Sequence, residues 1–121
     1  MRMWKVPPKF LCRKHLLGEH VELHMFVGSH RKGTRLQTYI DYGQLDPRYV
    51  YERHEELVAE MIARGYNHKS PIDKIVCESI DKDYNYEGQL NVDHNILDLK
   101  TRCAECEERI NEFSGSIKAA A

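Results

Sequence analysis

The segment from Asp46 to Gly65 carries the most regular helical pattern in the chain. Asp46 and Pro47 favour a helix start, since aspartate is a common N-cap and proline fits the first turn. Gly65 favours the end, because glycine adopts the left-handed conformation that closes many helices. Between them, six residues recur at the spacing of a helix: Val50, His54, Leu57, Val58, Met61 and Ile62.

Two further segments show helical spacing. One begins near Pro8 and is expected to end at Gly28. The other runs from about Asn91 or Asp93 to Ile110, and its apolar stripe consists of Val92, Ile96, Leu99, Cys103, Cys106 and Ile110. A short piece around 36–42 is expected to be either extended or helical, and a short helix is expected around 72–80. Without a convincing alternating strand, these patterns predict an all-α fold, a compact single domain of three main helices with long connecting loops.

The bulk composition fits one globular domain. The chain has 121 residues, of which 41% are hydrophobic and 31% are charged. We assign residues 1–113 to a single helical domain and residues 114–121 to a flexible C-terminal tail. No apolar run approaches the roughly 18 residues of a membrane span, and no signal peptide is visible. We therefore expect a cytoplasmic protein without a membrane partner, whose four cysteines remain free thiols.

The net charge is −1, whereas proteins that bind duplex DNA usually carry a basic excess. Basic residues nevertheless concentrate in the first third of the chain. Arg31, Lys32 and Arg35 fall in a connection that is either an exposed solubilising loop or a phosphate-binding loop. The distribution permits a basic face on a nearly neutral protein.

The segment 14–28 places His15, Glu19 and Glu22 on one helical face, at i, i+4 and i+7. This face is either simply solvated or part of a site, because buried carboxylates require partners. Gly18 is expected to let the N-terminal segment approach the helix closely. A neighbouring stripe can face the core: Leu16, His20, Leu23, Phe26 and Val27.

Cys103 and Cys106 form a CxxC pair. A zinc site needs four ligands, and we find no second CxxC and no suitably spaced HxxxH pair. His94 and Cys77 could in principle complete a site, but their spacing does not indicate one. Because both CxxC cysteines fall on a helical core stripe, we expect buried free cysteines, no metal and no cofactor.

Glu22 can act as a general acid or base only if a reactive group approaches it. No serine, cysteine or lysine motif supplies an obvious nucleophile, which leaves the α-amine of Met1. An α-amine has an ordinary pKa of about 8, more than two units below that of lysine, so more of it is neutral at pH 7. A neutral amine can attack sugar or carbonyl carbons to form a Schiff base.

The stretches HLLGEHVELHMFVG and HEELVAEMIARGYNHK, separated by a basic loop, resemble the phage pyrimidine-dimer DNA glycosylase family, also called endonuclease V. The resemblance covers roughly residues 1–70 and extends more loosely to the last helix. It implies a compact, mainly three-helix protein with an N-terminal amine nucleophile and a helix-one glutamate.

Carried over by position, the resemblance assigns the nucleophile to Met1 and the catalytic glutamate to Glu22. It places Arg2 beside the nucleophile, and it matches His15 and Glu19 to a histidine and a glutamate of the same helix. We expect Met1 to be retained, because Arg2 is bulky. With the basic residues of the first third, the expected nucleotide- or phosphate-binding set is Arg2, Arg13, Lys14, His15, Glu19, Arg31, Lys32 and Arg35.

The sequence departs from the family at two positions: arginines that grip DNA in the family fall on Val21 and Met25. Each lost phosphate contact lowers the slope of log K for DNA binding against log salt concentration by about one unit. Three hypotheses follow. The chain is a glycosylase and abasic-site lyase acting on damaged DNA, or a non-catalytic phage nucleotide-binding protein, for example an oligomeric sponge for cyclic dinucleotides in the host cytoplasm. The third is a structural domain with a solvated helix face.

Overall fold

The computed structural model describes residues 1–68 and 70–120, with side chains of 115–120 left aside. Within these residues the regular secondary structure is entirely helical, which confirms the predicted all-α class. Over the same residues, no helix is both long and apolar enough to cross a membrane. The elements are η1 (Pro8–Phe10), α1 (Arg13–Arg31), α2 (Gln37–Asp41), α3 (Val50–Ala63), α4 (Lys74–Asp83), α5 (Val92–Arg102) and α6 (Ala104–Ala120).

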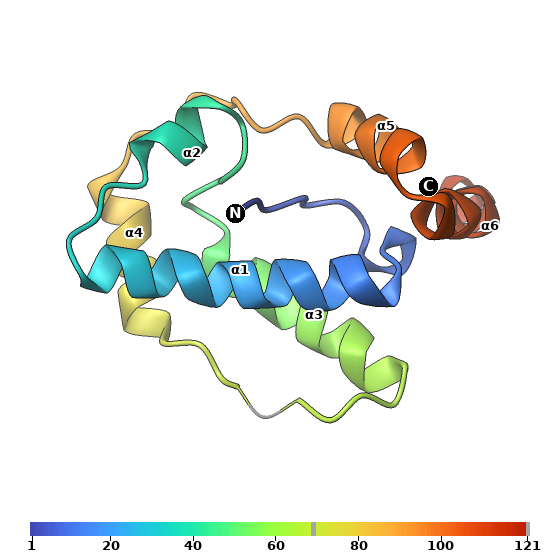
Figure 1. Cartoon of the computed structure of the whole chain (residues 1–121), viewed down its shortest axis with the longest axis horizontal. Helices are drawn as coiled ribbons and strands as arrows, with labels where there is room; N and C mark the ends of the chain where they lie inside the picture. Colours follow the sequence, from blue (N-terminus) through green and yellow to red (C-terminus); the bar gives the residue numbers. More distant parts are fainter. Residues whose placement is uncertain (69, 121) are drawn as a thin grey trace.

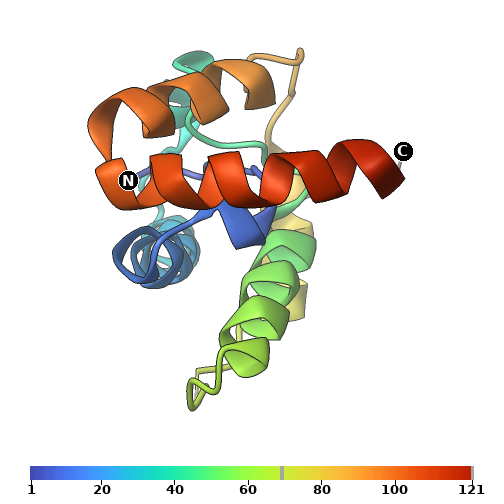
Figure 2. The ribbon, with the colours of Figure 1, turned by 90° about the vertical axis from the view of Figure 1, so that its right-hand side faces the viewer.

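Helix α1 lies at the centre of the molecule and contacts α3 and α4 (Figure 1). Helix α6 contacts both α5 and η1, so the two C-terminal helices lie beside the start of α1 (Figure 2). The N-terminal segment, residues 1–7, runs between α1 and α5 (Figure 1). Its side chains Met3 and Val6 are buried in the core, which fixes the segment to the helices around it.

Helix α1 begins and ends later than expected. Pro8 opens only a 3-10 turn, after which Leu11 and Cys12 are extended and the α-helix starts at Arg13. The expected end at Gly28 is wrong, because the helix continues to Arg31. Gly33, with a φ of +81°, takes the left-handed conformation instead.

Helix α3 ends as predicted but starts three residues into the expected helix. Gly65 has a φ of +83°, and its N–H donates to Ile62 O in a helix-closing turn. The expected N-cap at Asp46 is wrong, since the carboxylate accepts from Arg48 N–H and the N-cap position falls on Tyr49. Of the two alternatives for residues 36–42, the structure shows the helical one, as α2, and the short helix predicted around 72–80 is confirmed as α4.

The expected single helix to Ile110 is wrong, because it is broken at Cys103, which is extended with φ −135° and ψ 111°. Breaking the helix lets α5 bury Leu99 while α6, turned away from it, buries Cys106 and Ile110. Helix α6 reaches Ala120, and residue 121 of the expected flexible tail lies outside the described residues. The tail's flexibility stays a prediction.

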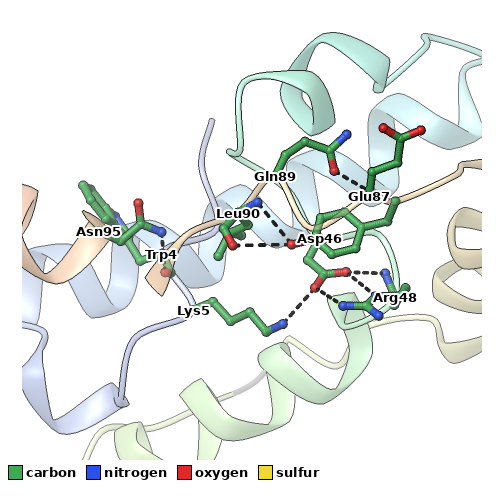
Figure 3. A network of polar contacts seen from close by, with 9 residues as sticks. Trp4, Lys5, Asp46, Arg48, Glu87, Gln89, Leu90 and Asn95 are labelled. Atoms are coloured by element: carbon green, nitrogen blue, oxygen red, sulfur yellow. Dashed lines mark hydrogen bonds and ion pairs between the residues drawn. The ribbon is translucent and has the colours of Figure 1, made fainter. Parts of the chain in front are cut away.

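The N-terminal segment is held by polar contacts on both sides (Figure 3). Asn95 Nδ2 of α5 donates to Trp4 O at 2.8 Å. Lys5 Nζ lies 2.8 Å from Asp46 Oδ2, and the guanidinium of Arg48 binds the same carboxylate. Burial alone would raise the pKa of Asp46, but hydrogen bonds from Arg48 and Lys5 outweigh it and hold the pKa below its usual value.

We expect Asp46→Asn to lower the free energy of unfolding at pH 7 by about 1–3 kcal/mol, through hydrogen bonds lost from a buried group. Because the folded pKa of Asp46 lies below its unfolded value, its stabilisation is complete above the unfolded pKa and disappears as pH falls through the folded pKa. Urea unfolding should therefore show a gap between wild type and D46N that narrows below about pH 4.

The matched control is Asp81→Asn, at an exposed position on α4. This variant should stay within about 0.5 kcal/mol of wild type at pH 7. A wild-type-to-D46N gap that stays constant from neutral to acidic pH would contradict the role given to the Asp46 carboxylate.

Candidate active site

A cavity of about 440 Å³ opens between the N-terminal segment and the first half of α1. It gathers residues that are far apart in the sequence, including both proposed catalytic residues, Met1 and Glu22. Arg13, Arg31, Lys32 and Arg35 are not among the residues that line it. The lining residues are Met1, Arg2, Trp4, Lys14, His15, Gly18, Glu19, Glu22, Gln44 and Arg102.

The floor of the cavity includes Gly18. A Cβ added at this glycine would meet nothing within 4 Å, so the expected close approach of another backbone is wrong. The missing side chain instead leaves space in the cavity. Gly18 lies one helical turn from both His15 and Glu22, whose side chains line the same cavity.

Glu22 contacts the N-terminal segment directly. Its Oε2 accepts a hydrogen bond from the backbone N–H of Arg2 at 3.1 Å. This bond holds the carboxylate one residue away from the α-amine of Met1. Among the ion pairs of the described residues, none joins that amine to Glu22, so the two groups share the cavity without a direct salt bridge.

The Arg2 side chain is held by residues of α5 and by the ring of Trp4. Its Nη1 lies 2.9 Å from Asp98 Oδ2, its Nη2 donates to Asn95 Oδ1, and its guanidinium lies 3.8 Å from the centre of the Trp4 ring. Arg102 Nε contacts the other oxygen of Asp98 at 2.8 Å. Because two guanidinium groups share one carboxylate, a net positive charge remains at this wall of the cavity.

Glu19 is buried, and its carboxylate is bound by Arg53. Arg53 of α3, which is only 1% exposed, donates to both of its carboxylate oxygens, from Nη2 to Oε1 at 3.0 Å and from Nε to Oε2. Burial alone would lower the pKa of Arg53, but the Glu19 charge and hydrogen bonds raise it. Glu19 therefore shapes the cavity wall through a buried ion pair.

His15 lines the cavity while its Nδ1 faces sulfur atoms. Nδ1 lies 3.2 Å from Cys12 Sγ and 3.5 Å from Cys106 Sγ. Burial lowers the pKa of His15, and the charge of Lys14 lowers it further, while Glu22 opposes the shift. A neutral ring offers hydrogen bonds rather than charge, so Lys14 is the better cation of this helix turn.

The other basic residues of the predicted set lie away from the cavity. Arg13 stacks over Tyr66, Arg31 pairs with Asp73 at 2.9 Å, and Arg35 lies over the ring of Tyr84. Lys32 is exposed just after α1. The basic connection after α1 is thus spread over the opposite end of that helix, and its phosphate-binding role stays a prediction.

Sequence reasoning missed several residues that the fold brings to the site. Gln44 and Arg102 enter from distant elements, and no local motif marks them. Cys12 had a readable signal, because Cys12-x2-His15 mirrors Cys103-x2-Cys106. His20 and His24 form an HxxxH pair on α1, although not at a spacing that pairs it with the CxxC motif in the sequence.

Comparison with known proteins gives one finding. A family model described as pyrimidine dimer DNA glycosylase matches residues 1–74, which hold Met1, Arg2, Glu22 and most of the cavity wall. Neither the curated proteins nor the solved structures compared with the chain gave a match. The match spans more than half of the chain, and the chain therefore belongs to the pyrimidine dimer DNA glycosylase family.

Proposed function

We propose that the protein removes damaged pyrimidines from DNA and cleaves the resulting abasic site, with Met1 as the nucleophile and Glu22 as its acid–base partner. The observation that carries this proposal is the shared cavity of Met1 and Glu22, with the Arg2 amide bonded to the Glu22 carboxylate. Membership of the family supplies the reaction class.

In the first step, the neutral α-amine of Met1 attacks C1′ of the damaged nucleotide. A bond forms between nitrogen and C1′, and the glycosidic bond breaks, with its electrons and a proton leaving on the base. The C1′–O4′ bond of the sugar then breaks, O4′ takes a proton from solvent, and an iminium ion remains between the amine nitrogen and C1′. Glu22, which lines the same cavity as Met1, stabilises the positive charge that develops on the sugar in this proposal.

In the second step, a base removes a proton from C2′ of the iminium ion, and the 3′ phosphate leaves by β-elimination. Glu22 is the carboxylate of the cavity suited to this role, because Glu19 has both oxygens bound by Arg53. Water then hydrolyses the imine and restores the amine of Met1. Lys14 and the positive charge shared by Arg2 and Arg102 support phosphate binding beside the cavity.

A second candidate is a binding protein for small nucleotides that has lost the duplex surface. Val21 and Met25, where the resemblance expects DNA-gripping arginines, are 54% and 49% exposed on α1. An exposed apolar pair contributes no phosphate contacts, whereas the cavity beside it retains cations and the Trp4 ring. These positions favour local recognition of a nucleotide over binding along a duplex.

Borohydride reduction should trap a covalent adduct between the protein and DNA containing an abasic site or a pyrimidine dimer, because reduction converts the imine to a stable amine. Glu22→Gln should lower the rate of strand cleavage at least about 100-fold, the lower range for a lost general acid or base. Single-turnover cleavage of end-labelled DNA measures this rate.

Glu112→Gln serves as the matched control, since it changes an exposed carboxylate on α6 and should cleave at the wild-type rate. Extending the chain before Met1 by a short peptide removes the proposed amine and should abolish the adduct. Absence of any wild-type adduct, combined with calorimetric binding of a cyclic dinucleotide, would replace the catalytic proposal by the second candidate.

A further inference from the structure

Four possible metal ligands meet where the start of α1 packs against the C-terminal helices. Cys12 is the N-cap residue of α1 and His15 lies in its first turn. Cys103 forms the break between α5 and α6, and Cys106 lies in the first turn of α6. One ligand atom of each of the four residues lies within 4.8 Å of all the others.

The distances match a tetrahedral zinc site. Zinc bonds of about 2.3 Å to sulfur and 2.0–2.1 Å to nitrogen place two sulfurs about 3.8 Å apart, and sulfur and nitrogen about 3.6 Å apart. Cys12 Sγ lies 3.8 Å from Cys103 Sγ. His15 Nδ1 lies 3.2 Å from Cys12 Sγ and 3.5 Å from Cys106 Sγ.

Two of the sulfurs accept hydrogen bonds from backbone N–H groups. The backbone N–H of Cys12 donates to Cys106 Sγ at 3.3 Å, and that of Cys106 donates to Cys103 Sγ at 3.5 Å. All three cysteines are free, and the 3.8 Å between Cys12 and Cys103 sulfurs far exceeds the about 2.05 Å of a disulfide. Backbone donors to sulfur stabilise the charge that a thiolate ligand carries.

We propose that Cys12, His15, Cys103 and Cys106 bind one zinc ion. Three soft thiolates and an imidazole select zinc over magnesium or calcium. Four protein ligands fill the tetrahedron, so the site is structural and leaves no position for substrate. Binding replaces the thiol protons by metal–sulfur bonds and releases those protons to solvent.

The zinc ion would join the part of the chain matched by the family model to the part outside it. Cys12 and His15 belong to residues 1–74, whereas Cys103 and Cys106 follow the match. His15 and Arg102, on the two sides of this junction, both line the cavity. The metal therefore fixes α5 and α6, and with them Arg102 and Asp98, against the N-terminal half.

Elemental mass spectrometry of the purified protein measures its zinc content. This test needs no substrate, so its outcome is independent of lyase activity. Cobalt substitution reports this site alone, because only thiolate ligands give the sulfur-to-cobalt charge-transfer band. We expect the band in wild type and in Cys77→Ser, which changes a buried cysteine outside the cluster. Cys103→Ser should lose the band together with about one zinc ion per chain.

A second measurement requires no substitution. Cys103 is half-buried, and as a zinc ligand it should resist iodoacetamide until a chelator is added. Equal alkylation of Cys103 with and without chelator would overturn the proposal. So would a wild-type protein without the cobalt–thiolate band, or a C103S protein that keeps the band.

A separate cluster of histidines lies on the other side of α1. His20 Nε2 is 3.1 Å from the Nε2 atoms of both His54 and His68, and His24 Nε2 is 3.2 Å from that of His54. The carbonyl oxygen of Ser70 lies 2.8–3.2 Å from the Nε2 atoms of His24, His54 and His68. Nitrogens bound to one zinc ion would lie about 3.3 Å apart.

Hydrogen bonds alone do not account for these contacts. If His24 and His54 both donate to Ser70 O, their own 3.2 Å contact contains two N–H groups and no acceptor. If either lacks that hydrogen, its bare nitrogen faces the lone pairs of the carbonyl. A cation between His20, His54 and His68 resolves the conflict, because the Nε2 lone pairs of these three rings can then point toward it while the N–H of His24 donates to Ser70 O.

From these contacts we infer that the imidazoles of His20, His54 and His68, whose ligand atoms all lie within 4.8 Å of one another, form a second metal site, suited to zinc or a similar transition-metal ion. His54 Nδ1 lies 2.9 Å from Glu55 Oε1, and such an outer carboxylate orients a metal-binding ring. This site joins α1, α3 and the turn after α3, and it shares no ligand with the cysteine site.

Elemental analysis of His68→Gln tests this second site. We expect H68Q to hold about one metal ion fewer per chain than wild type while it keeps the cobalt–thiolate band of the cysteine site. His94→Gln, at an exposed position on α5, should keep the full metal content. Wild-type metal content in both H68Q and His54→Gln would overturn the assignment.

Discussion

The fold depends on Arg53, a fully buried cation that ties three parts of the chain together. From α3 it binds both carboxylate oxygens of Glu19 on α1, and its Nη1 donates to Val6 O of the N-terminal segment at 2.6 Å. Removing one partner of a buried ion pair typically costs about 3–5 kcal/mol, because the remaining charge is left unpaired. The same contacts fix the segment that carries Met1 along α1, beside Glu22.

Helix existence could be predicted from the sequence better than helix ends. The stripe from Val50 to Met61 and the stop at Gly65 follow from periodicity and glycine conformation, and both are observed. The predicted start of a helix is wrong where a tertiary contact binds the side chain that was expected to cap it. Asp46 binds Lys5 and Arg48 instead of capping α3, and the apolar stripe through Cys103 concealed a break that only packing of α6 explains.

The cavity contains much of the predicted site, because Met1, Arg2, His15 and Glu22 were placed by a family resemblance that carries spatial information. Single-element reasoning could not join Cys12 to Cys103, since the two residues meet only after α5 and α6 fold back on the start of α1. Periodicity placed His20 of α1 and His54 of α3 among the apolar residues of their helices for the same reason. Their converging nitrogens become visible only in the packed structure.

The proposed cleavage reaction depends on Met1 supplying the attacking amine, in a cavity where Lys14 offers a second amine. Tandem mass spectrometry of the borohydride-reduced protein–DNA adduct, after digestion of both polymers, distinguishes the two. The role proposed for Met1 predicts that the deoxyribose remnant resides on the α-nitrogen of Met1 in the N-terminal peptide. A remnant on the Lys14 side chain, with an unmodified Met1, would contradict it.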